Sequence, residues 1–118
     1  MATAQEKRKA IGILQSISWD LQQLELSLRL KGEFDAAEKI WGANQRLATE
    51  IDVIIGQVIE QWSEEVPAIT ADLAKAESDV RDSIASIKQD FKNAQLIVEV
   101  VGLVDDVVKL ALKLATAV

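Results

Sequence analysis

Four carboxylates near the middle of the chain have the residue types that a divalent cation would need: Glu60, Glu64, Glu65 and Asp72. Glu60 and Glu64 are one helical turn apart, so their side chains would share a face of a helix. Mg²⁺ and Ca²⁺ bind carboxylate oxygens, but calcium loops also need a glycine at their sharp turn, and none stands among these residues. We therefore interpret the cluster as a solvated acidic helix end and expect no metal or other cofactor.

The other common chemistries lack their side chains. The chain contains no histidine and no cysteine, which excludes a Ser-His-Asp triad, the Glu-x-x-His pairs of di-iron bundles and cysteine-ligated zinc. It has neither a phosphate-binding glycine-rich loop nor a dinucleotide fingerprint. The sequence thus predicts a protein that is not an enzyme.

The net charge of the chain indicates which classes of partner it can bind. The net charge is −6 and the pI is near 4.6, whereas nonspecific nucleic-acid binding depends on clustered Lys and Arg. The one basic run, residues 7–9, is typical of a solvated helix start, so we expect no nucleic-acid partner. The N-terminus lacks the apolar core of a signal peptide, which predicts a cytoplasmic location.

The three tryptophans are candidate anchors for a protein partner. Trp41, Ala48, Ile55 and Trp62 follow one another at seven-residue spacing. This stripe fits either a core of alternating large and small residues or an exposed aromatic strip, since tryptophan is enriched at interface hot spots. Trp19 lies off the main apolar pattern of its segment, and of the three tryptophans it is the one we expect to be partly exposed.

The tryptophans and the carboxylates must be positioned by helices. Apolar residues recur at alternating three- and four-residue steps along most of the chain, which is the spacing of one side of a helix. We call each such set a seam. Ile11, Leu26 and Leu30 would widen the first seam enough to contact a neighbour on each side. The three seams are Leu14, Ile17, Leu21, Leu24 and Leu28; Ile40, Asn44, Leu47, Ile51, Ile54 and Val58; and Leu73, Ala76, Val80, Ile84, Ile87 and Phe91.

The pattern predicts an all-α antiparallel helical bundle in a single domain, 1–118. Gly32 can adopt the left-handed backbone conformation that commonly ends a helix, and Pro67 fits the first turn of the next one. A turn at residues 63–67 would make the second and third helices antiparallel neighbours. Asn93 is a candidate left-handed cap. We expect four helices at about 4–31, 34–64, 67–92 and 95–117.

The alternative is three long helices, with an unbroken 67–117 helix in an oligomer. Such a helix would be about 75 Å long against about 45 Å for each of the first two. The excess would leave an apolar overhang that a monomer rarely tolerates. Four helices are therefore favoured for a monomer, and the long helix for an oligomer.

Asn44 stands in a seam otherwise made of aliphatic residues. A buried amide there would need a hydrogen-bonding mate and would help to fix register, as in coiled coils. Alternatively, Asn44 lies at the solvent edge of the seam. The sequence favours neither reading.

The C-terminal segment is apolar around most of its circumference, with only a narrow polar stripe. It therefore predicts a core helix, an oligomer interface or a membrane contact. Lipid-binding helices usually carry a basic polar face, but this stripe has three acids and two lysines. The candidate partner surface is Leu96, Val100, Leu103, Val107, Leu110 and Leu114.

The sequence thus predicts a non-catalytic bundle that binds a protein partner or itself, with a homo-oligomer expected. The alternative function is a membrane-active, toxin-like protein that inserts its C-terminal helix in lipid.

Overall fold

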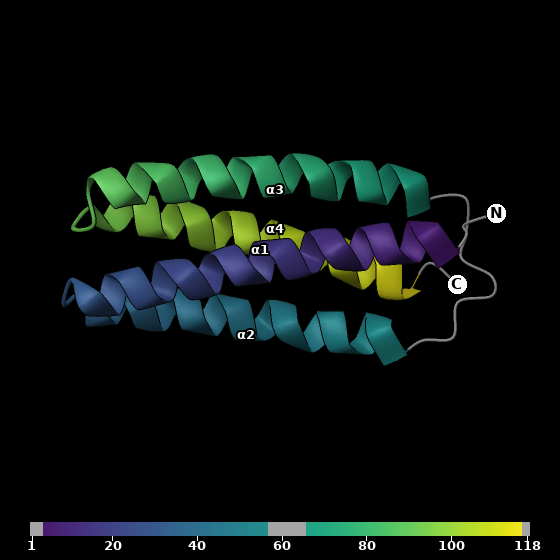
Figure 1. The fold of residues 1–118 in the computed structure, drawn as a ribbon, viewed down its shortest axis with the longest axis horizontal. Coiled ribbons are helices and arrows are strands. Elements are labelled where there is room, and N and C mark those ends of the chain that lie inside the picture. Colours follow the sequence, from purple (N-terminus) through teal and green to yellow (C-terminus); the bar gives the residue numbers. More distant parts are fainter. Residues whose placement is uncertain (1–3, 57–65, 117–118) are drawn as a thin grey trace.

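The computed structural model describes residues 4–56 and 66–116, which form four helices (Figure 1). These are α1 (Ala4–Leu30), α2 (Phe34–Gly56), α3 (Val66–Gln89) and α4 (Ala94–Thr116). The all-α, four-helix prediction is confirmed. The unbroken 67–117 helix is wrong, because the chain turns between α3 and α4. The predicted end of the second helix, residues 57–64, lies outside the described residues.

The helices form two hairpins, α1–α2 and α3–α4, that pack side by side (Figure 1). α1 packs against α2 and α3, and α4 packs against the same two helices. α2 and α3 run in opposite directions, as expected, but they are not the neighbours we predicted, because they occupy opposite corners of the bundle. This arrangement places α4, the most apolar helix, between two others that cover its wide apolar side.

The predicted seams are the core. Leu73, Val80, Ile84 and Ile87 of the third seam are buried, whereas Ala76 and Phe91 are half-buried. Val58 lies outside the described residues. Every other residue of the first two seams is buried: Leu14, Ile17, Leu21, Leu24, Leu28, Ile40, Asn44, Leu47, Ile51 and Ile54.

The predicted widening of the first seam is wrong at Leu26 and Leu30, although α1 does contact a helix on each side, α2 and α3. Leu26 and Leu30 are 53% and 78% exposed, and Ile11 is only half-buried. α1 sits at a corner of the bundle, where its two neighbours cover one side of the helix and leave the opposite side to solvent. The apolar residues on that outer side are therefore free for another role.

A glycine ends α1 as predicted. Gly32 has φ = 78°; its N–H donates to the Arg29 carbonyl at 3.1 Å, and the Glu33 N–H donates to the Leu28 carbonyl at 2.9 Å. These two bonds are the Schellman pattern, which satisfies the last carbonyls of a helix. The turn that starts the α1–α2 hairpin is thus encoded locally.

Gly32→Ala should destabilise the protein by about 1 kcal/mol, because an alanine is strained at positive φ. A Cβ at Gly32 would meet no atom within 4 Å, so the loss would be a backbone effect alone. Gly102, an exposed helical glycine with equally open surroundings, is the matched control. Gly102→Ala should stabilise by up to about 1 kcal/mol. Urea unfolding of the two variants should therefore shift in opposite directions, and shifts of the same sign would contradict this account.

The second hairpin turn uses a different device. Asn93 does not have the positive φ expected of a left-handed cap. Instead its side-chain Oδ1 accepts from the Gln95 N–H at 3.1 Å, which caps the start of α4. The two turns also meet, since the Lys31 ammonium lies 5.7 Å from the centre of the Phe91 ring.

Candidate protein-interaction surface

The outer side of α1 carries no charge over five turns. Between Ile11 and Leu30, every residue that is exposed is also uncharged. Trp19 is the aromatic residue among them and is 60% exposed. We call this set the α1 face: Gly12, Gln15, Trp19, Gln22, Gln23, Leu26 and Leu30.

Each charged residue of the same stretch is held in an ion pair. Arg81 of α3 donates from Nε to Asp20 Oδ2 at 3.0 Å and from Nη2 to Ser16 Oγ at 2.8 Å. The hydrogen bond to Asp20 raises the pKa of Arg81, helped by the charges of Glu77 and Asp20. Glu25 and Arg29 pair with each other on α1 at 2.8 Å. Asp20 is thus paired with α3, and Glu25 and Arg29 are paired with each other.

α2 adds aromatic side chains beside the α1 face. Trp41 is 49% exposed and Phe34 is 59% exposed. The Ser18–Asn44 hydrogen bond sets the register of the antiparallel pair, which places Trp19 level with Ala43 and so within about one helical turn of Trp41 along the bundle. The structure therefore brings two of the three candidate tryptophans to one layer of the bundle. Trp62 lies outside the described residues.

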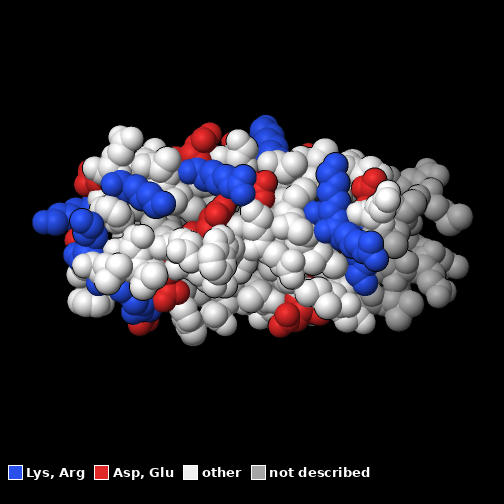
Figure 2. Space-filling model, viewed as in Figure 1, with Lys and Arg blue, Asp and Glu red and all other residues white. Residues whose placement is uncertain are grey.

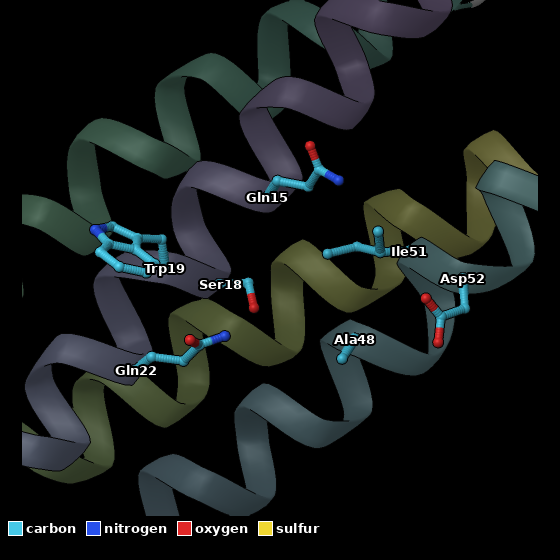
Figure 3. Close-up of a pocket in the computed structure, with 7 residues that line it drawn as sticks. All are labelled: Gln15, Ser18, Trp19, Gln22, Ala48, Ile51 and Asp52. Atoms are coloured by element: carbon cyan, nitrogen blue, oxygen red, sulfur yellow. The ribbon is translucent and has the colours of Figure 1, made fainter.

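An open hollow of about 280 Å³ lies between α1 and α2 beside Trp19 (Figure 3). This volume is at the lower limit for small-molecule sites, and Asp52 is the one ionisable residue in the lining. A lone carboxylate offers no acid/base pair. The lining residues are Gln15, Ser18, Trp19, Gln22, Ala48, Ile51 and Asp52.

No metal site is formed by the part of the chain that the structure describes, where no group of three or more Asp or Glu side chains is placed to hold an ion. Glu60, Glu64 and Glu65, the acidic residues considered in the sequence, lie outside that part. Asp72 is described and lies on the exposed side of α3.

Asn44 is buried, with 4% exposure, and has the mate that one of its two readings required. The Ser18 hydroxyl donates to Asn44 Oδ1 at 2.7 Å across the α1–α2 contact. Ser18 was not identified from the sequence. Its signal is a small polar residue beside Ile17, at the edge of the first seam.

Asn44→Ala should destabilise the protein by about 1–3 kcal/mol, because it leaves a buried hydroxyl without its acceptor. Ser18→Ala alone should also destabilise. The double variant should lose about 1 kcal/mol less than the sum of the two single losses. A double-mutant cycle from urea unfolding measures this coupling, and strict additivity would show that the pair contributes no interaction energy.

Half of the six residues expected to form a partner surface on α4 are buried in the core of the bundle. Val100, Val107 and Leu114 are fully buried within one chain, so they belong to the core and not to an exposed surface. Leu96, Leu103 and Leu110 are half-buried against that core. Val100, Val107 and Leu114 alternate with the buried Ile97, Val104 and Ala111 at three- and four-residue steps. All six therefore lie on one side of α4, which α2 and α3 together cover.

The α1 face itself was missed in the sequence, although a signal for it was present. Asp20, Glu25 and Arg29 are the only charged residues between Ile11 and Leu30. Three charges in this 20-residue stretch, in a chain with 27% charged residues, indicate that part of its exposed side is neutral.

In residues 4–56 and 66–116, no helix combines the length and the apolar character that a bilayer crossing requires. Comparison of the chain with protein-family models, with curated proteins and with solved structures found no match.

Proposed function

We propose that this protein is a non-catalytic interaction module that binds a protein partner through the α1 face and the neighbouring aromatic residues of α2. The single observation that carries the proposal is the combination of exposed Trp19, Leu26 and Leu30 with a stretch, Ile11 to Leu30, whose three charged residues are all ion-paired and none of whose exposed residues is charged. Interfaces are distinguished by this composition, enriched in aromatic residues and depleted in charge at their centre.

The other helices show what an ordinary solvated surface looks like in this chain. Figure 2 shows charged side chains over α3 along the upper part of the view and an uncharged area over the middle of α1 and the adjoining part of α2 below it, with further charged side chains towards the ends and along the lower edge. A solvated surface normally mixes charges of both signs. The exposed charged residues of α3 are Asp72, Lys75, Asp79, Arg81, Asp82 and Lys88.

The rigid helices of the bundle also make the α1 face and Trp41 suitable for binding. Trp19 and Trp41 project from helices whose opposite sides are fixed in the core, so little conformational entropy is lost when they contact a partner. Tryptophan combines a large apolar area with an N–H donor, which is why it anchors interfaces. The hollow beside Trp19 would accept one side chain of the partner.

Site-specific photo-crosslinking tests the proposal. A benzophenone amino acid at Leu26 should yield protein adducts in the cells that naturally make the chain. The same amino acid at Leu112 is the matched control, since Leu112 is a comparably exposed leucine (44%, against 53% for Leu26) on another helix. Adducts at Leu26 that exceed those at Leu112 several-fold support the proposal. Equal yields at the two positions would refute it.

A further inference from the structure

We propose that the partner is a second copy of this chain, and that the α1 faces of the two copies pack against each other antiparallel about a two-fold axis at the level of Leu21. This inference rests on the proposed function and names the occupant of the same surface. Four observations support it: the residue spacing of the α1 face, its lack of charge, the sizes of its side chains, and the area that it and the neighbouring aromatic residues expose.

The α1 face repeats the spacing of a coiled-coil seam on the outside of the bundle. Gly12, Gln15, Trp19, Gln22 and Leu26 follow one another at steps of three, four, three and four residues, and Leu30 comes one turn later. This alternation is what two long helices need in order to pack along their lengths. α1 thus carries one seam for its own bundle and a second seam for another helix.

Charge favours a copy of the same chain. In a two-fold interface each residue near the axis meets its own equivalent, so any charge there would be repelled. The protein carries a net charge of −6, yet the α1 face has none. Its glutamines are amides, each with a donor and an acceptor, so two identical glutamines can bond to each other.

The sizes of the side chains favour antiparallel over parallel packing of the two α1 helices. With the axis at the level of Leu21, antiparallel packing places Gly12 opposite Leu30 and Trp19 opposite Gln23, so small or slender residues meet large ones. Parallel packing would put Trp19 against Trp19 and leave Gly12 facing Gly12. Close packing requires large residues to face small ones.

The area exposed by the α1 face and the neighbouring aromatic residues of α2 reaches the lower end of the range for standard interfaces. Trp19, Leu26, Leu30, Phe34 and Trp41 are between 49% and 78% exposed. At about 200 Å² for a large side chain, they expose on the order of 600 Å² per copy, and the glutamines add to it, against roughly 800 Å² per partner in a standard interface.

Light scattering of the purified full chain tests the inference at about 1–100 μM, a range set by the weaker affinities seen for interfaces of this size. The chain should have twice its mass of 12.9 kDa at the upper end. Gln22→Glu places like charges beside the axis and should raise the dissociation constant at least tenfold. Gln95→Glu, an exposed glutamine on α4, should leave it unchanged. Mixing the Gln22→Glu and Gln22→Lys chains should restore a dimer.

Two results would overturn the inference. One is a monomer throughout the concentration range; the proposed function would survive this result if the Leu26 adducts contain another protein. The other is a dimer that Gln22→Glu does not weaken, which would place the interface elsewhere on the bundle. Each is distinct from the failure of the proposed function, which is the absence of any preference for Leu26 over Leu112 in crosslinking.

Discussion

Leu24→Asp is expected to unfold the protein at 25 °C. Leu24 is a fully buried interior residue of the first seam. A carboxylate there must be desolvated without a partner or become protonated, and the leucine's packing is lost as well. The combined loss of about 4–5 kcal/mol is close to the total stability of a small domain. Circular dichroism should show little residual helix and no cooperative melting.

Leu26→Asp is the matched control, with the same substitution two residues away on the same helix. Leu26 lies on the α1 face and is 53% exposed, so the monomer should keep its helical spectrum and lose at most about 1 kcal/mol. Ile51→Asp, in the second seam, should behave like Leu24→Asp. If Ile51→Asp melted like the parent chain, the seam assignment of α2 would be wrong.

Removal of all residues after Asn93 is expected to abolish cooperative folding. α4 contributes six buried residues: Ile97, Val100, Val104, Val107, Ala111 and Leu114. Their burial stabilises the fold by about 10 kcal/mol at 1.5–3 kcal/mol for each large side chain, which matches the whole stability of a typical domain. The truncated chain should be poorly soluble and show no sharp thermal transition, because apolar sides of α2 and α3 would be exposed.

A full-length chain carrying Val98→Gln and Leu112→Gln is the control, since both residues are exposed on α4. It should melt cooperatively, near the parent temperature. A truncated chain that stayed monomeric, soluble and cooperatively folded would show that α4 is a detachable element. That result would favour the membrane-active alternative over the interaction module.

Helix periodicity predicted the architecture because apolar residues spaced three and four apart share one side of a helix, and a wide apolar side must be buried against other helices. Leu14 through Leu28 and Ile40 through Ile54 are buried as their spacing requires, and Gly32 has the backbone conformation that its type and place predicted. The diagonal placement of α2 and α3 was not predictable in this way. Spacing identifies the buried side of each helix, but not which helix will cover it.

The candidate surface was only partly predictable. The exposure of Trp19 was predicted from its position off the first seam, whereas Val100, Val107 and Leu114 looked like surface candidates because α4 is apolar on most sides. Which apolar side remains exposed depends on the packing of all four helices. The α1 face was overlooked because its signal is an absence of charge, and because Leu26 and Leu30 resembled an extension of the core.

Alkylation of a single cysteine tests most directly whether the α1 face is an interaction surface, since the chain has no cysteine of its own. Gln23→Cys reports on the α1 face and Gln95→Cys on α4. In intact cells, we expect the cysteine at position 23 to be alkylated several-fold more slowly than in the dilute purified chain, while position 95 reacts at the same rate in both. Equal rates in both settings at position 23 would contradict the account, because they would show the α1 face to be uncovered where the protein works.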